Sequence, residues 1–160
     1  EITQDIGFTS ESGFTYTRDC ISNCPGHVTI VVSMPCTSGC PWRAINEGIS
    51  ACQPRLEQDW SLFNALLKNY ERLVRAVGTR AHTIFEWPMR CRHWRLREVS
   101  KLMLKMKLQT TCFDGCVYGL KSASREESHK VLNKPWQLST DIPDIDPLFS
   151  LLCPGTDGGY

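Results

Sequence analysis

Two residues with reactive side chains each follow an apolar run of this chain. Cys36 comes after "VTIVVSMP" and Glu86 comes after "HTIF". A cysteine thiolate can add to an electrophilic carbon, and its availability depends on how strongly its surroundings lower the pKa of the thiol. A carboxylate after an apolar strand is costly unless it is hydrogen-bonded or faces a solvated crevice. The two residues therefore predict a pocket that holds a nucleophile and a polar binding group.

The cysteines also allow a zinc site. Cys91 and His93 form a mixed pair, and three cysteine pairs have three residues between their members: Cys20/Cys24, Cys36/Cys40 and Cys112/Cys116. Zinc accepts such spacings. The first choice for a tetrahedral site is the set Cys20, Cys24, Cys36 and Cys40. In that alternative Cys36 is not a free nucleophile.

Other interpretations of the same residues stay open. Cys36 as a buried structural thiol would pack as a small hydrophobe, and Glu86 would then make a structural hydrogen bond to nearby backbone. A thiol hydrolase that pairs Cys36 with a histidine is the weakest enzyme class, because no His follows at a position that the strand order would bring near this thiol.

A basic segment follows the Glu86 run. Residues 90–107 contain seven Lys and Arg against the single Glu98. Such a segment is either the solvated face of a helix or a surface that faces anions. In the second case the segment would bind nucleic acid. Its phosphates would contact Arg90, Arg92, Arg95 and Arg97, and a base would stack on Trp94.

Composition sets the broad class of the protein. The chain has 160 residues, is 41% hydrophobic and 22% charged, and carries a net charge of +1, which is typical of one globular domain and argues against disorder throughout. There is no apolar run of about 20 residues, so we expect no membrane span. The opening residues resemble no signal peptide. We therefore expect an internal fragment of an intracellular protein, in the nucleus or cytoplasm, whose nine cysteines are reduced.

The elements that must position these side chains alternate between strand and helix. A β-branched run at 27–33 predicts a strand buried on both faces. Apolar residues at spacings of three and four over 55–77 predict a long amphipathic helix that ends at Gly78. The remaining predictions are a strand at 81–87, a helix at 96–108, a strand region with a glycine turn at 110–120 and a strand at 134–140.

This alternation predicts an α/β fold, a partial Rossmann-like parallel sheet flanked by helices, over residues 27–140. We expect residues 1–26 to be an irregular N-terminal segment and residues 141–160 an irregular acidic tail. Ligands of such sheets bind beyond the carboxyl ends of the strands. Because Cys36 and Glu86 each follow a strand, a thiol and a carboxylate should face one crevice.

The order of these parts resembles that of the cytosine-5 DNA methyltransferases. The matching pieces are "TIVVSMPCTSG", the helix at 55–77, "TIFEWP", the helix at 96–108 and "CVYGLKS". The resemblance implies that the Cys36 thiolate adds to carbon 6 of a flipped-out cytosine and that Glu86 hydrogen-bonds ring nitrogen 3. It also implies S-adenosylmethionine as cofactor.

This chain departs from the family in several places. It has Thr37 after Pro35-Cys36 where the family has Gln, and Trp87-Pro88 after Glu86 where the family has Asn-Val. The strand and Gly-rich loop that would hold S-adenosylmethionine are not recognised before residue 27. We therefore expect a methyltransferase-like, nucleic-acid-associated module that is inactive without a further cofactor-binding part.

A second resemblance is to an uncharacterised segment of retroelement-type polyproteins. It depends on residues 85–88, 113–116 and 134–136. The resemblance implies an alternative function, a zinc-supported, non-enzymatic module of a mobile element that binds nucleic acid or another partner. The sequence leaves the oligomeric state open.

Overall fold

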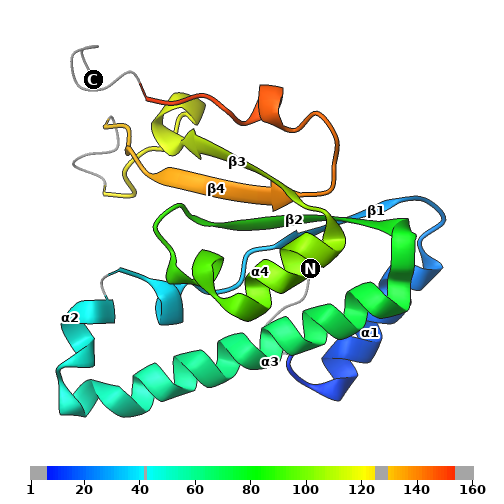
Figure 1. The fold of residues 1–160 in the computed structure, drawn as a ribbon, viewed down its shortest axis with the longest axis horizontal. Helices are drawn as coiled ribbons and strands as arrows, with labels where there is room; N and C mark the ends of the chain where they lie inside the picture. The colour runs from blue at the N-terminus through cyan, green and yellow to red at the C-terminus, as the bar shows by residue number, and fades with distance from the viewer. Residues whose placement is uncertain (1–6, 42, 125–129, 154–160) are drawn as a thin grey trace.

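The computed structural model describes residues 7–41, 43–124 and 130–153. A four-stranded sheet and a layer of helices form the chain (Figure 1), so the predicted α/β class is confirmed. The main elements in chain order are α1 (Glu11–Asn23), β1 (Val28–Val32), α2 (Arg43–Glu47), α3 (Gln53–Val77), β2 (Ala81–Pro88), α4 (Arg97–Met106), β3 (Gln109–Asp114) and β4 (Pro135–Thr140).

The sheet is mixed, with strand order β1-β2-β4-β3. β1 pairs with β2 in parallel, and Val32 lies opposite Phe85. β4 is antiparallel to both of its neighbours. The expectation of a parallel sheet is therefore correct only for β1 and β2, because β4 is inserted in the reverse direction. β1, β2 and β3 still run the same way and are connected through α3 and α4, which is consistent with a partial Rossmann-like fold.

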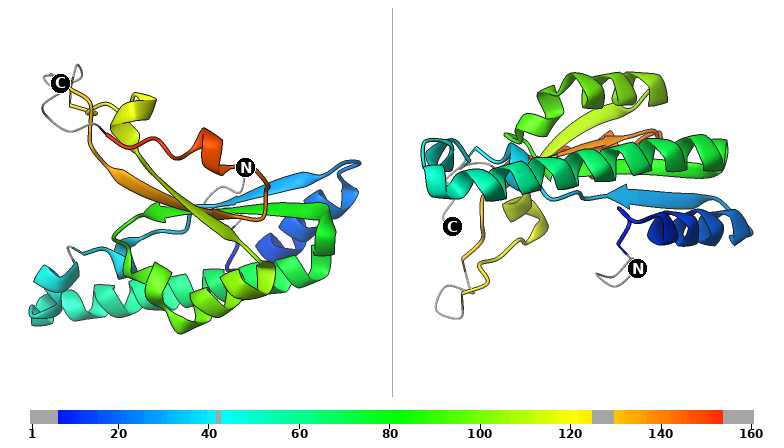
Figure 2. Two further views of the ribbon diagram at one scale, coloured as in Figure 1. Left: turned by 45° about the horizontal axis from the view of Figure 1, so that its top comes forward. Right: turned by 90° about the horizontal axis from the view of Figure 1, so that it is seen from below.

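The helices α1, α3 and α4 cover one face of the sheet (Figure 2). Thr83, Phe85 and Trp87 point into this layer from β2 and are at most 1% exposed. On the opposite face Val31 of β1 is 65% exposed. The prediction that this strand is buried on both faces is wrong, because no helix of the described residues covers its second face.

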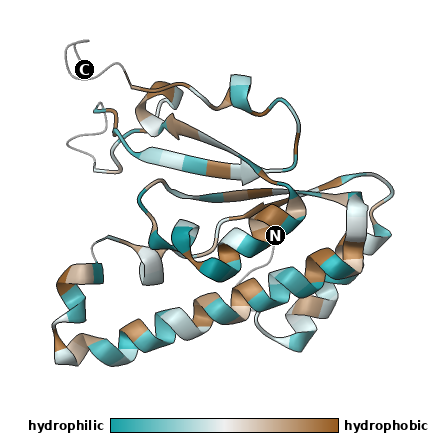
Figure 3. Ribbon diagram, viewed as in Figure 1, coloured by the Kyte–Doolittle hydropathy of each residue, from teal (hydrophilic) through white to brown (hydrophobic). Residues whose placement is uncertain are grey.

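The long helix α3 begins and ends close to the predicted bounds. Pro54 occupies the first turn, where its missing N–H costs nothing, and Gly78 ends the helix with φ 61°. Apolar and polar residues alternate in bands along this helix (Figure 3), and the apolar face packs on the sheet. Tyr70 on that face shares a 2.6 Å hydrogen bond with Thr83 of β2.

The segment before β1 differs from the prediction. Residues expected to be irregular form α1, which begins where the Ser10 hydroxyl accepts a hydrogen bond from the Gly13 N–H at 3.0 Å. Phe14 and Ile21 of α1 pack on the last turns of α3. The sequence pattern that would predict this helix is weak, because its two buried apolar residues are seven positions apart and Thr, Arg and Asp lie between them.

After β4, the described residues 141–153 contain a short 3₁₀ turn at Asp146–Leu148 and no other helix or strand. This segment packs against β3, because Thr111 Oγ1 donates to the Phe149 carbonyl at 2.7 Å. Residues 154–160 of the predicted tail lie outside the described residues. None of the described helices combines the length and apolar character needed to cross a bilayer.

Candidate functional site

The ends of β1 and β2 bring a serine and a glutamate together. Val32 and Phe85 are register partners, and they are followed by Ser33, the first residue after β1, and by Glu86 of β2. The Ser33 hydroxyl donates to Glu86 Oε2 at 2.5 Å. The two strand ends that the sequence predicted to share an edge are therefore adjacent.

The second carboxylate oxygen of Glu86 has no partner within the described part of the chain. Oε1 is inaccessible to solvent and makes no hydrogen bond to the described residues. A buried acceptor that lost its water without gaining a donor costs roughly 1–3 kcal/mol. An N–H group of a ligand would relieve this cost.

Cys36 lies close enough to Glu86 for the carboxylate to act on its thiol. Burial raises the pKa of the Cys36 thiol, and the neighbouring Cys40 and Glu86 raise this pKa further, whereas Lys134 opposes them. The thiol is consequently protonated at neutral pH. The loop that presents it is anchored to β2, because the Trp87 indole N–H donates to the Met34 carbonyl at 2.8 Å.

Lys134 is a further charged neighbour of Cys36, and it lies against the ring of Trp136. The Lys134 Nζ lies 3.9 Å from the centroid of the Trp136 ring, and Trp136 is the register partner of Pro88. Sequence reasoning did not identify Lys134 as a site residue. It precedes a strand, so only the antiparallel direction of β4 could have placed it beside the carboxyl end of β2.

A buried histidine fixes the loop that carries Cys36. Ser38 Oγ and His93 Nε2 are 2.8 Å apart, and the His93 ring stacks on Phe63 at 3.8 Å. Burial, with a smaller contribution from Arg43, lowers the pKa of His93 to about 4, so the ring is neutral. A histidine does lie next to this loop, contrary to the argument made against a thiol hydrolase, but its hydrogen bond is to Ser38 rather than to Cys36.

The structure separates the cysteines chosen for the zinc alternative. Cys20 and Cys24 lie at the end of α1, before β1 begins, while Cys36 and Cys40 follow the end of β1. A five-residue strand spans about 17 Å. Within the described part of the chain, no three His, Cys, Asp or Glu side chains are grouped so as to hold a metal ion.

The basic segment lies in the loop after β2 and in α4. Arg92 pairs with Glu47 at 2.8 Å. Trp94 is half-buried, donates to the Pro88 carbonyl at 3.1 Å and packs its ring against Trp87. Trp94 is therefore a packing residue rather than a free stacking platform. The other three arginines are exposed and form no ion pair with described residues: Arg90, Arg95 and Arg97.

A groove of about 500 Å³ follows the edge of β1 that pairs with no described strand. Residues 30–35 form one side, and Leu66, Tyr70 and Leu73 of α3 lie on the other. The groove reaches Met34 and Pro35, which immediately precede Cys36.

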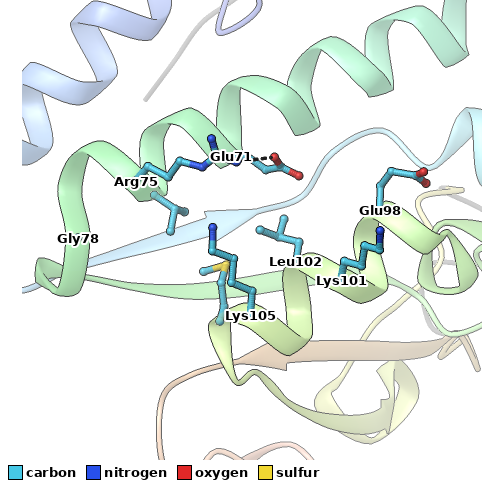
Figure 4. A pocket seen from close by; sticks show the side chains of 9 residues that line it. Glu71, Arg75, Gly78, Glu98, Lys101, Leu102 and Lys105 are labelled. Atoms are coloured by element: carbon cyan, nitrogen blue, oxygen red, sulfur yellow. Dashed lines mark hydrogen bonds and ion pairs between the residues drawn. The ribbon is translucent and has the colours of Figure 1, made fainter.

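A second cavity, of about 410 Å³, lies between α3 and α4 (Figure 4). Its floor is apolar, and its rim carries Lys101, Lys105 and the ion pair of Arg75 with Glu71 at 3.5 Å. It is formed by the ends of helices that lead into β2 and β3. Because ligands of α/β sheets bind at the opposite, carboxyl ends of the strands, we place the candidate site at Cys36 and Glu86.

Comparison of this chain with protein-family models, with curated proteins and with solved structures found no match. The sequence motifs and the geometry at the ends of β1 and β2 are therefore the observations that bear on function.

Proposed function

We propose that this chain is a methyltransferase-like, nucleic-acid-associated module, and that a cytosine base binds in a crevice beside Cys36 and Glu86. The observation that carries this proposal is the buried Oε1 of Glu86, which has no donor among the residues that the structure describes. The other carboxylate oxygen, Oε2, is already held by Ser33.

Cytosine supplies the donor that this carboxylate lacks. Its exocyclic amino group is an N–H donor, and a carboxylate that accepts from it is a recurrent contact with this base. Uracil and thymine have a carbonyl oxygen at that position, so they would face Oε1 with a second acceptor. A site of this kind should distinguish the bases by roughly 1–3 kcal/mol.

The surroundings of the crevice suit a nucleic-acid strand. Arg90, Arg95 and Arg97 follow β2 directly, are exposed and have no acidic partner among the described residues. They can contact phosphates while the base enters the crevice. Lys134 adds a cation beside Cys36, which its effect on the pKa of that thiol reveals.

The described residues do not fit S-adenosylmethionine. Residues 7–27 form α1 and its flanking turns, and they contain no strand followed by a Gly-rich loop that could hold the cofactor. The Cys36 thiol is moreover held protonated by its burial. The proposed activity of this chain is therefore recognition of the base, and no methyl-transfer step is derived from it.

Base preference tests the proposal. Fluorescence anisotropy would measure binding of two labelled single-stranded oligonucleotides that differ only in one central cytosine or uracil. We expect the wild-type chain to bind the cytosine strand about tenfold more tightly. Glu86→Gln should remove or invert the preference for cytosine, because an amide can donate to the uracil carbonyl. Glu98→Gln, on the exposed surface of α4, is the control and should leave the preference unchanged. Equal affinity of the wild-type chain for both strands would overturn the proposal.

The alternative function, a zinc-supported binding module, gains no comparable observation. Its four cysteines lie at opposite ends of β1. Metal analysis of the purified chain separates the two hypotheses. One tightly bound zinc per molecule, with loss of the fold in chelator, would favour the alternative and remove Cys36 from the base pocket.

A further inference from the structure

The end of the described chain is held against β3 by several contacts. The Asp114 N–H donates to the Leu151 carbonyl at 3.0 Å, and the Cys153 N–H donates to Asp114 Oδ2 at 2.8 Å. The Tyr118 hydroxyl donates to the Leu148 carbonyl at 2.8 Å, and its ring stacks on Phe149. Residues 148–153 therefore form a strap with a fixed position on β3 and on the turn that follows it.

This strap brings two cysteine thiols together. Cys116 lies in the 3₁₀ turn Gly115–Tyr118, directly after β3, and is only 7% exposed. Cys153 lies on the strap and is half-buried. Cys153 lies close enough to Cys116 to raise the pKa of the Cys116 thiol, and burial raises this pKa further. Asp114 connects the two segments that carry these cysteines. It ends the strand β3 that leads into the turn with Cys116, and its carboxylate accepts a hydrogen bond from the Cys153 N–H.

We propose that Cys116 and Cys153 are a modification site, at which a low-molecular-weight disulfide such as oxidised glutathione converts the two thiols into a reversible protein disulfide. The Cys153 N–H is bonded to Asp114, only two residues before Cys116, so the two cysteines lie in neighbouring segments held together by the strap. This site is independent of the proposed base pocket.

The exchange proceeds through a mixed disulfide. The more accessible Cys153 loses its proton and attacks one sulfur of oxidised glutathione, and the other half leaves as a thiolate that takes up a proton. Cys116 then loses its proton and attacks the Cys153 sulfur, which releases the second glutathione thiol. The protein loses two hydrogen atoms, and the glutathione disulfide is reduced to two thiols.

The burial of Cys116 makes the second step limiting. Thiolate is the attacking species, so the rate of ring closure should increase with pH until the Cys116 thiol is ionised. The mixed disulfide on Cys153 should therefore accumulate at neutral pH and convert to the protein disulfide faster at alkaline pH.

The disulfide would tie the strap covalently to the β3 turn. It would close the loop between residues 116 and 153, which includes the whole of β4. Cross-links over loops of this length stabilise mainly by restricting the unfolded chain. We expect the midpoint of thermal unfolding to rise by on the order of 10 °C, and the rise should disappear on addition of a reductant.

Mass spectrometry tests the site directly. The intact chain is treated with oxidised glutathione, the remaining thiols are alkylated, and the protein is digested with trypsin without reduction. We expect the peptide containing Cys116 to be linked to the peptide containing Cys153. Cys112 falls on the same tryptic peptide as Cys116, because both lie between Lys107 and Lys121, so fragmentation of the linked species must identify the bonded sulfur.

Two variants complete the experiment. Cys153→Ser, at the end of the strap, should abolish both the linked peptide and the thermal shift, whereas Cys112→Ser should retain both. Linkage through Cys112, or a Cys153–glutathione adduct that never converts to the protein disulfide at alkaline pH, would overturn the proposal.

Discussion

Ser38 and His93 join the loop after β1 to the loop after β2 through a buried contact of 2.8 Å between Oγ and Nε2. Ser38 is two residues from Cys36, and His93 follows the strand that carries Glu86. The relative position of the thiol and the carboxylate thus depends on a polar contact in the core. The neutral state of His93 is part of this arrangement.

Acid should destabilise the fold through His93. Its pKa is lowered from 6.5 to about 4 in the folded chain. Above pH 6.5 both folded and unfolded chains carry the neutral ring. Between pH 6.5 and 4 only the unfolded chain takes up the proton, so the free energy of unfolding should fall by up to about 1.4 kcal/mol per pH unit. Denaturant unfolding at a series of pH values should show a smaller slope for His93→Gln; an unchanged slope would contradict the assignment.

Gly39→Ala should loosen the same loop. A Cβ at this position would lie 2.6 Å from His93 Cδ2 and 2.8 Å from Cys91 Sγ, and both groups are buried in the core. Overpacking of this kind costs about 1–3 kcal/mol. Gly48→Ala is the matched control, since nothing lies within 4 Å of its Cβ position. Thermal unfolding should separate the two variants, and equal midpoints would show that the loop adapts.

The thiol of Cys36 should respond to its two charged neighbours in opposite directions. Glu86 raises its pKa and Lys134 lowers it. Glu86→Gln should therefore speed alkylation of Cys36 by iodoacetamide at neutral pH, and Lys134→Met should slow it, because only the thiolate reacts. Peptide mass spectrometry over a pH series measures both rates. If both substitutions shift the rate in the same direction, the electrostatic account of the site is wrong.

The exposed arginines should control the salt dependence of nucleic-acid binding. Replacement of Arg90, Arg95 and Arg97 by Ala should reduce the slope of log affinity against log salt by about 2 for a single strand. Arg92→Ala is the internal control, because this arginine is already paired with Glu47. Anisotropy titrations at several salt concentrations give the slopes. An unchanged slope in the triple variant would assign this segment to solvated surface.

The sequence predicted those parts of the fold that have strong periodicity. The α3 helix and the strands β1 and β2 were recognised because apolar spacing, Pro54 and Gly78 agree with one another. The contact between Ser33 and Glu86 agrees with the rule that parallel strands end at one edge. The helix α1 was missed, because its helical signal consists of a serine cap and two apolar residues.

The rest depended on tertiary contacts that no local pattern contains. The reverse direction of β4 is set by its pairing with β2 and β3, and this pairing is what brings Lys134 to the site. Trp94 was predicted as a stacking residue, yet its ring is packed against Trp87. His93 lies within a basic segment, and only the folding of its loop onto Phe63 makes it a core residue.

The pairing of β1 with β2 also has a consequence for how the chain folds. Ser33 and Glu86 are 53 residues apart in the sequence, and the whole of α3 lies between them. Closing so long a loop is entropically expensive and slow, whereas α3 and the β3–β4 region depend on more local contacts. We expect the candidate site to be assembled late in folding and to be lost early in unfolding. The base binding proposed for this site would then report on the completeness of the native state.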